Sequence, residues 1–291
     1  MGSNHRPRGV TAVVALAWTA SRVAGLALRT APTRRSSPVH MSVAVFGATG
    51  LTGRECAYQL VERGTKVRAL CRDPARLLTP LGSCGETAAD KPLESPEMLF
   101  KYKGDVTKAE DVAKVFEAGD VEGVIVALGG KTKDVGPTML ADGTRHVIDE
   151  CNKRGVKRIA VVTSIGTGDS KDQAPFFFKI LMSTVMSSIF TDKNAQEALF
   201  TAGAAAPGAE LEWTVVRPGG LTVEPPTGVV NVIDGQAGSI PRADVAAFCI
   251  GAVLDDDWEY VRQTPCISST GGVGWTKDRS AKAREGAKVA A

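Results

Sequence analysis

Short apolar runs alternate with stretches of helical pattern from residue 42 onward. Several runs, such as 124–128 and 159–162, are continuous, which is typical of strands buried on both faces of a parallel sheet. The runs predict strands at 43–46, 66–71, 98–102, 123–128, 158–163, 212–216, 229–233 and 264–268. The periodic stretches predict helices near 51–63, 108–118, 138–154, 189–203 and 241–254. Strict alternation favours βαβ units in one α/β domain, a Rossmann-like doubly wound parallel sheet with helices on both faces.

Three segments fall outside this alternation. Residues 1–40 contain six arginines and no acidic residue, a composition typical of an organellar transit peptide that is disordered or removed. The apolar run 10–18 offers a second interpretation, a signal-peptide core, and Met41 offers an internal start. A plastid is the predicted location, with mitochondrion or cytoplasm as alternatives. We expect the domain at 41–275, with a polar, exposed insertion at 79–97 and a basic tail at 276–291.

Charge and cysteine usage limit the classes of function. The net charge of +3 includes +6 from the leader, so the body is mildly acidic and lacks the basic face that nucleic-acid binding requires. Six cysteines without a C-x-x-C pair argue against a disulfide framework or a zinc site. The body has a single histidine, His146, so no metal site or nucleophilic triad is expected. No run reaches the roughly 20 apolar residues of a transmembrane helix.

A glycine-rich turn follows the first strand of the body. Gly47, Gly50 and Gly53 form G-x-x-G-x-x-G between that strand and a helix. Their expected roles are a tight turn, close approach of the backbone to a diphosphate, and close packing of the helix on the sheet. The helix start then presents free N–H groups to the phosphates. The turn predicts a nicotinamide dinucleotide site at Gly47, Ala48, Thr49, Gly50, Leu51, Thr52 and Gly53.

Two arginines favour NADP(H) over NAD(H). An NAD site places an acidic residue at the end of the second strand, where it holds the ribose. Here Arg72 stands at that place, and Arg54 directly follows the last glycine of the turn. Two guanidinium groups would pair with a 2′-phosphate. Asp73 could still hold a ribose, and Arg54 could be a solvated helix residue, so NAD(H) stays open.

The chain resembles the atypical short-chain dehydrogenase/reductase group. Within it, the resemblance is to NAD(P)H-binding, NmrA-like and flavin reductase/biliverdin reductase B-like proteins, including plastid relatives in plants. The segment 213–221 (WTVVRPGGL) followed by 240–248 (IPRADVAAF) is typical of a smaller group of proteins than the glycine turn, which the whole superfamily shares. The resemblance is carried by VAVFGATGLTG (43–53), VRALCRDPARL (67–77), GDV (104–106), VIVALGG (124–130), GVKRIAVVTSIG (155–166), DKNAQEALFTAG (192–203) and the two segments above.

The resemblance implies further cofactor contacts at matching positions. It places adenine at Asp105 and Val106, ribose and phosphates at Ala127, Leu128 and Gly129, nicotinamide at Thr163 and Ser164, and the carboxamide at Pro218 and Gly219. Structural roles are the alternative for two of these residues. Asp105 suits a helix cap or turn before Lys108, and Ser164 suits the turn after a strand.

The catalytic pair of the superfamily is missing. Its usual members use Tyr-x-x-x-Lys, in which the tyrosine donates a proton. Here the residues four positions after the tyrosines Tyr58, Tyr102 and Tyr260 are Glu62, Val106 and Thr264. The corresponding region, 176–199, is apolar at 176–190 and then carries Lys193, which could face an acidic substrate or a phosphate, or be a solvated helix residue. Ser164 and Lys193 are therefore the catalytic candidates.

These features support three hypotheses. The first is a reductase that moves hydride from NADP(H) to a flat conjugated acceptor (flavin, quinone or tetrapyrrole) without a Tyr-Lys dyad, because the cofactor carries that chemistry. The second is a non-catalytic cofactor-binding scaffold, redox sensor or assembly factor with an organellar protein partner. The third is a carbon-skeleton reductase or epimerase. Fold by itself does not choose among them.

Overall fold

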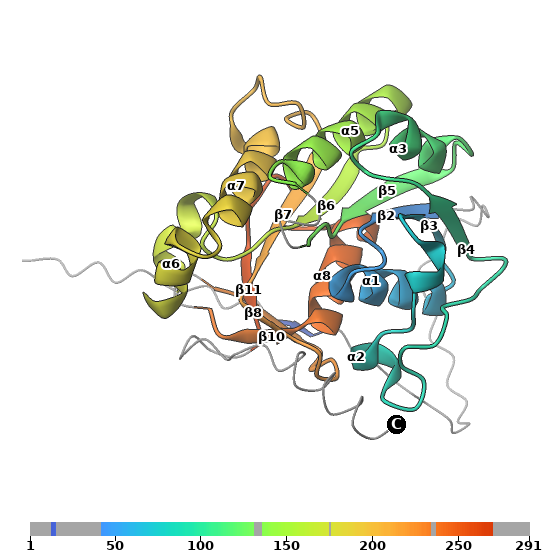
Figure 1. The fold of residues 1–291 in the computed structure, drawn as a ribbon, viewed down its shortest axis with the longest axis horizontal. Helices are drawn as coiled ribbons and strands as arrows, with labels where there is room; N and C mark the ends of the chain where they lie inside the picture. Colours follow the sequence, from blue (N-terminus) through green and yellow to red (C-terminus); the bar gives the residue numbers. More distant parts are fainter. Residues whose placement is uncertain (1–12, 16–41, 131–135, 175, 234–236, 270–291) are drawn as a thin grey trace, which may run out of the picture.

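A nine-stranded sheet forms the centre of the computed structural model, which describes residues 13–15, 42–130, 136–174, 176–233 and 237–269. The strand order is β1-β9-β11-β7-β6-β5-β2-β3-β4 (Figure 1). Pairing is parallel from β11 to β4, whereas β9 and β1 add an antiparallel edge. The strands are β1 (Val13–Ala15), β2 (Ser42–Phe46), β3 (Lys66–Cys71), β4 (Leu99–Lys103), β5 (Val121–Val126), β6 (Arg158–Val162), β7 (Glu212–Pro218), β9 (Val229–Val232) and β11 (Cys266–Ser268).

Helices cover both faces of the sheet, which confirms the predicted doubly wound fold. One face carries α1 (Leu51–Glu62) and α8 (Arg242–Leu254), and the other carries α3 (Ala109–Phe116), α5 (Met139–Arg154) and α7 (Ser187–Thr201) (Figure 1). Alternate residues of one strand enter the two cores: Val43 and Val45 pack with α1 and α8, Ala44 and Phe46 with α3 and α5. The strands are continuous apolar runs because both faces are covered.

Short elements were not predicted from the pattern. A second, two-stranded parallel sheet joins β8 (Gly220–Thr222) to β10 (Ser239–Pro241), and strands of three residues carry too little periodicity to detect. The polar segment after β6 forms η2 (Gly168–Gln173), and the apolar stretch beyond it begins with α6 (Phe176–Ser183). On α6, Phe178 and Met182 are buried, whereas Phe176 and Ile180 are exposed. The other short elements are η1 (Pro74–Arg76) and α2 (Leu81–Cys84).

The predicted insertion at 79–97 is held against α1. Arg54 on α1 donates to Asp90 at 2.7 Å, and Gln59 donates to Ser83 at 3.1 Å. Leu93 is buried, while much of the rest of the segment is exposed. Within the predicted leader, β1 pairs with β9. The rest of residues 1–41, and the whole predicted tail 276–291, lie outside the described residues.

The strand order fixes where a ligand site forms. From β2 the chain runs to β3 and β4 on one side, and then crosses to β5, β6 and β7 on the other. The carboxyl ends of β2 and β5 therefore flank the point where the winding reverses. In open α/β sheets, ligands bind in the crevice at this switch point.

Candidate functional site

The turn between β2 and α1 packs backbone against backbone. Gly47 has φ of +85°, and a Cβ there would lie 2.3 Å from the carbonyl oxygen of Ala127, at the end of β5. A Cβ on Gly53 would lie 2.1 Å from the carbonyl oxygen of Gly47. The Gly50 N–H closes the turn on the Gly47 carbonyl at 2.9 Å. Glycine is thus required at both ends of the turn by contacts with other backbone atoms.

The first turn of α1 is built to accept an anion. Gly50 is its N-cap and makes no side-chain capping bond, and the first turn contains no acidic residue. The N–H groups that a helix leaves unpaired at its start therefore point toward the switch point without a competing carboxylate. The glycine cradle and these donors fit the diphosphate of a dinucleotide.

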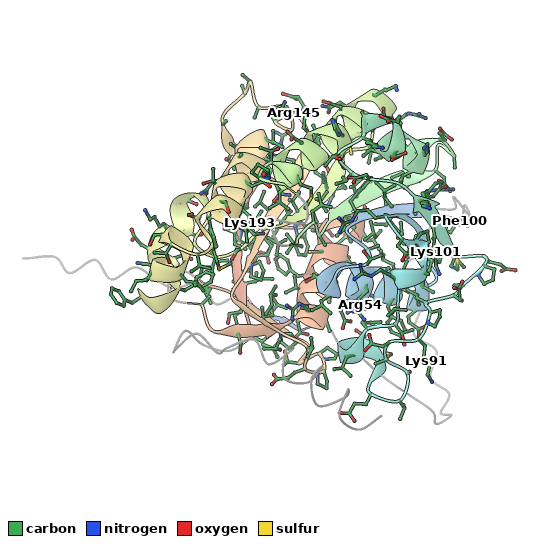
Figure 2. All side chains as sticks on the ribbon, in the orientation of Figure 1. Arg54, Lys91, Phe100, Lys101, Arg145 and Lys193 are labelled. Atoms are coloured by element: carbon green, nitrogen blue, oxygen red, sulfur yellow. The ribbon has the colours of Figure 1, made fainter. Side chains whose placement is uncertain are left out.

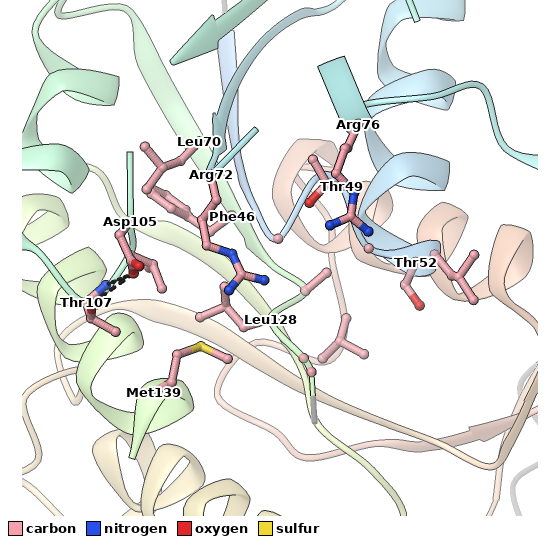
Figure 3. A pocket seen from close by; sticks show the side chains of 18 of the residues that line it. Phe46, Thr49, Thr52, Leu70, Arg72, Arg76, Asp105, Thr107, Leu128 and Met139 are labelled. Atoms are coloured by element: carbon pink, nitrogen blue, oxygen red, sulfur yellow. Dashed lines mark hydrogen bonds between the residues drawn. The ribbon is translucent and has the colours of Figure 1, made fainter. Parts of the chain in front are cut away.

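A pocket of about 610 Å³ opens beside this turn, along the carboxyl ends of β2 to β6 (Figure 3). Its size is typical of small-molecule and cofactor sites. Thirteen predicted site residues line it: Gly47, Thr49, Gly50, Leu51, Thr52, Arg72, Asp105, Val106, Ala127, Leu128, Gly129, Thr163 and Lys193. The lining residues that were not predicted are Phe46, Leu70, Arg76, Gly104, Thr107, Gly130, Met139, Val162, Leu221 and Arg242.

Six predicted residues do not line the pocket. Ala48 and Gly53 are buried in the packing of the turn. Arg54 is paired with Asp90 at 2.7 Å, on the side of α1 that holds the 79–97 segment. Ser164 donates to the carbonyl of Ile165 at 3.0 Å. The backbones of Pro218 and Gly219 instead join β7 to its neighbours, through Ile165 N–H to the Pro218 carbonyl and Gly219 N–H to the Ile267 carbonyl, each at 3.0 Å.

Two arginines mark one end of the pocket. Arg72 follows β3, Arg76 ends η1, and both guanidinium groups lie in the pocket (Figure 3). Asp73 caps η1 by accepting the Ala75 N–H at 3.1 Å, and Pro74 begins the turn. Arg76, which was not predicted, thus lines the pocket together with Arg72, whereas Arg54 does not. The Asp-Pro pair after β3 was the available signal, because it predicts a capped turn that returns the chain to the strand ends.

Asp105 and Thr107 lie at the same end and form a local turn. The Asp105 carboxylate accepts the Thr107 N–H at 2.9 Å and the Thr107 hydroxyl at 2.8 Å. Asp105 thus has the turn role that was the alternative interpretation, and it still lines the pocket. Nearby, His146 bonds through Nδ1 to the carbonyl of Val106 at 3.1 Å, which gives this histidine a structural partner.

The other end of the pocket is built on α7. Lys193 donates to the carbonyl of Thr163 at 3.2 Å, and the Thr163 hydroxyl donates to Glu197 at 2.6 Å. Glu197 also accepts Arg217 of β7 at 2.6 Å, and both side chains are buried. Both side chains of this buried ion pair make further hydrogen bonds, and a buried ion pair is tolerated when its remaining polar groups are bonded in this way. The loop after β6 is therefore fixed to α7 one turn beyond Lys193.

The start of α7 is fixed on its other side as well. The Asp192 carboxylate accepts the N–H groups of Leu140 and Ala141, at 2.8 and 3.0 Å, and so caps α5. Gln196 donates to the hydroxyl of Thr144 at 2.8 Å. Lys193 thus projects from a helix that is bonded to α5 and to the loop after β6. Bonds made by other residues of α7 therefore help to fix the position of Lys193.

Burial lowers the pKa of Lys193 to about 8, because the charged ammonium loses hydration, and the nearby Glu197 and Asp192 oppose that shift. A lysine at this pKa changes charge near physiological pH. It is the one predicted catalytic side chain on the pocket wall. No tyrosine is among the described residues that line the pocket, so a tyrosine proton donor is not placed there.

The described residues contain no group of three or more His, Cys, Asp or Glu arranged for a metal ion. Among the helices that the structure describes, none is both long and apolar enough to cross a membrane.

Fold, glycine turn and pocket define a nucleotide-binding protein of the Rossmann type. Residues 47–256 match the NAD(P)H-binding family, and the chain belongs to this family. The predicted membership of the NAD(P)H-binding family, with a nicotinamide cofactor, is thereby confirmed.

Plant relatives are chloroplastic. An uncharacterised chloroplastic protein of Arabidopsis thaliana is 30% identical over 229 residues, which cover 75% of this chain and 74% of that protein. The chloroplastic protein TIC 62 of Pisum sativum is 28% identical over 198 residues, covering 65% of this chain but only 34% of that protein. The chain thus spans about a third of TIC 62. These relatives confirm the predicted plastid location.

Solved structures share the fold. The anaerobilin reductase ChuY of Escherichia coli O157:H7 has a TM-score of 0.59 at 22% identity, over 80% of this chain and 100% of ChuY. The oxidoreductase ylbE of Lactococcus lactis has a TM-score of 0.59 at 18% identity, over 84% of this chain and 96% of ylbE. At these identities the likeness establishes the fold and nothing finer.

The titration of Lys193 is testable. We expect this amine to lose its proton near pH 8, whereas exposed lysines titrate near the ordinary value of 10.5. Reductive methylation with ¹³C-formaldehyde and ¹³C NMR would follow each lysine, and K193M would assign the signal by its loss. If the K193M-sensitive signal titrates with the exposed lysines, the ammonium at this end of the pocket is not desolvated.

Proposed function

We propose that the protein is an NADP(H)-dependent reductase that transfers hydride to a flat conjugated acceptor. The observation that carries the proposal is a dinucleotide pocket whose described lining holds no tyrosine or histidine for proton transfer. Reduction of a carbonyl to an alcohol needs a proton donor beside the nicotinamide, and Lys193 is the one titratable side chain that the described lining offers at that end. Hydride transfer to a delocalised ring does not need one, because solvent protonates the reduced ring afterwards.

In this proposal the residues bind and orient, and NADP(H) supplies the hydride when bound. Arg72 and Arg76 hold the 2′-phosphate, and the first turn of α1 holds the diphosphate. The nicotinamide then lies toward Thr163 and Lys193, at the other end of the pocket. Lys193, rather than Ser164, is the polar side chain available to an acceptor, since Lys193 lines the pocket and Ser164 does not.

Comparison with the structural neighbours favours a reductase. ChuY is described as an anaerobilin reductase, and a tetrapyrrole is one of the flat acceptors considered for this chain. A second candidate function is a cofactor-binding scaffold with an organellar protein partner. The exposed apolar side chains Phe176, Ile180 and Val185 favour it, as does the relation to TIC 62.

The reductase proposal predicts acceptor-dependent oxidation of NADPH. Absorbance at 340 nm would be followed with the full chain, NADPH, and one flavin, one quinone and one tetrapyrrole in turn. We expect oxidation well above the buffer rate with at least one acceptor. Tight binding of NADPH without oxidation by any of the three would contradict the reductase and favour the scaffold.

Cofactor choice depends on the arginine pair. We expect the full chain to bind NADPH more tightly than NADH, and R72Q or R76Q to weaken NADPH binding at least tenfold, about 1.4 kcal/mol, with little effect on NADH. R54Q is the matched control, since Arg54 lies outside the pocket. Isothermal titration measures each affinity. Loss of NADPH preference in R54Q but not in R72Q or R76Q would restore the original assignment of Arg54.

A further inference from the structure

A buried ion pair lies next to the Lys193 end of the pocket. Arg217 of β7 donates through Nη2 to Glu197 of α7 at 2.6 Å, and through Nε to both carboxylate oxygens at 3.2 Å. Only 4% of the Arg217 side chain and 3% of the Glu197 side chain are exposed. We propose that Arg217 is a positioning residue: by binding the Glu197 carboxylate, it keeps the Lys193 amine unpaired and available to an acceptor in the pocket. This inference rests on the proposed reductase function.

The spacing along α7 favours a different pairing from the one observed. Lys193, labelled on α7 in Figure 2, precedes Glu197 by four residues, and opposite charges at this spacing on a helix are neighbours that commonly pair. Here the Lys193 ammonium instead donates to the carbonyl of Thr163 at 3.2 Å. Among the ion pairs formed by the described residues, Glu197 is joined to Arg217 and none includes Lys193.

The bonds to the Glu197 carboxylate explain why Lys193 does not pair with it. Oε1 accepts the hydroxyl of Thr163 at 2.6 Å, the hydroxyl of Thr167, and Nε of Arg217. Oε2 accepts Nε and Nη2 of Arg217. A carboxylate offers about four lone-pair sites, and these contacts occupy them. An ammonium group from Lys193 could bind Glu197 only by displacing one of these donors.

The loop after β6 closes over the ion pair. Gly168 has φ of +55°, and a Cβ there would lie 2.4 Å from Nη2 of Arg217 and 2.8 Å from Oε2 of Glu197, so this close approach requires glycine. The next residue, Asp169, binds Nη1 of Arg217, and 85% of the Asp169 side chain is exposed. The guanidinium therefore joins one buried carboxylate to one at the surface. Because the buried carboxylate has little contact with water, its charge is weakly screened.

Loss of the Arg217 guanidinium would change the partner of Lys193. The buried Glu197 carboxylate would then lack its counter-charge, which is strongly unfavourable, and the Lys193 ammonium lies one helical turn away. Burial lowers the pKa of Lys193 to about 8, and Glu197 and Asp192 oppose that shift. A Glu197 carboxylate released from Arg217 would oppose it more strongly. The amine would then be protonated to higher pH and bound to Glu197 instead of facing the pocket.

Other charged groups around Lys193 stay the same when the ion pair is altered. Asp192, on the same helix, caps α5 through two backbone N–H groups. The elements around α7 and the pocket lining add further charged side chains: Asp142 on α5, Lys179 on α6, Asp169 on η2 and Arg242 at the start of α8. Substitutions confined to the ion pair leave all of these in place, so a changed titration of Lys193 would report on Glu197.

Two substitutions should move the titration of Lys193 in opposite directions. The signal would be followed in the full chain, without cofactor or acceptor, by ¹³C NMR of methylated lysines, with K193M as its assignment. We expect R217Q to raise the pKa of Lys193 by about one pH unit, because Glu197 is released to pair with it. We expect E197Q to lower this pKa by about as much, because a neighbouring negative charge is lost. Mere loosening of the loop would hydrate the amine and raise its pKa in both variants.

Three further variants separate charge from folding. D169N is the matched control, because it removes the other carboxylate bound to Arg217 and leaves Glu197 paired; it should not change the titration of Lys193. R217K keeps a cation beside Glu197 and should titrate close to the unaltered protein. The double variant R217Q/E197Q should titrate like E197Q, since Arg217 acts through the carboxylate. It leaves neither charge of the pair buried alone, so it keeps the test available if R217Q does not fold.

Acceptor kinetics connect the ion pair to the proposed reaction. With an acceptor that oxidises NADPH, we expect the KM for that acceptor to rise about tenfold in R217Q, a loss of about 1.4 kcal/mol, because the Lys193 amine is withdrawn from the pocket. The affinity for NADPH should stay the same, since neither Arg217 nor Glu197 lines the pocket. D169N should leave both quantities unchanged.

Three outcomes would overturn the proposal. An unchanged pKa of Lys193 in R217Q would show that Arg217 does not control the pairing of this amine. A rise in both R217Q and E197Q would assign the ion pair to packing alone. An unchanged KM for the acceptor in R217Q, despite the expected titration, would show that the amine does not act on the acceptor. Failure of the reductase proposal appears separately, as the expected titrations in a protein whose NADPH no acceptor oxidises.

Discussion

The close contact between the glycine turn and the end of β5 determines how the whole site is built. Side chains at Gly47 or Gly53 would place a Cβ within 2.3 Å of a backbone oxygen, so the turn, the end of β5 and the start of α1 form one backbone-lined wall. That wall sets the unpaired N–H groups of α1 at the switch point of the sheet. Every other pocket element, from the arginines after β3 to Lys193 on α7, is arranged around it.

A second constraint is that α7 is fixed by long-range bonds on both sides. Its side chains bond to three neighbouring elements: to α5 from Asp192 and Gln196, to the loop after β6 from Lys193, and to β7 from Glu197. Toward the pocket this helix presents Lys193, whose pKa is lowered by burial. The site therefore combines a rigid nucleotide wall with cations at each end and little acid–base machinery. This arrangement is the basis for proposing a dinucleotide and a flat conjugated acceptor as its ligands.

The pattern of the chain was enough to predict the main sheet apart from β1, and its covering helices, because strands buried on both faces are unbroken apolar runs. The glycine turn was predictable because its geometry excludes side chains. Arg54 was misplaced because its partner, Asp90, lies 36 residues further on, in a loop without periodicity. Arg242 was missed because it follows a strand of only three residues, whose partner is equally short. Contacts between distant short segments leave no local signal.

The structure of the full chain bound to NADPH would locate each part of the cofactor. We expect the diphosphate at the Gly47–Gly53 turn, the 2′-phosphate between Arg72 and Arg76, and the nicotinamide toward Thr163 and Lys193. A nucleotide bound in the opposite direction, with its nicotinamide at Arg72 and Arg76, or bound outside this pocket, would contradict this expectation.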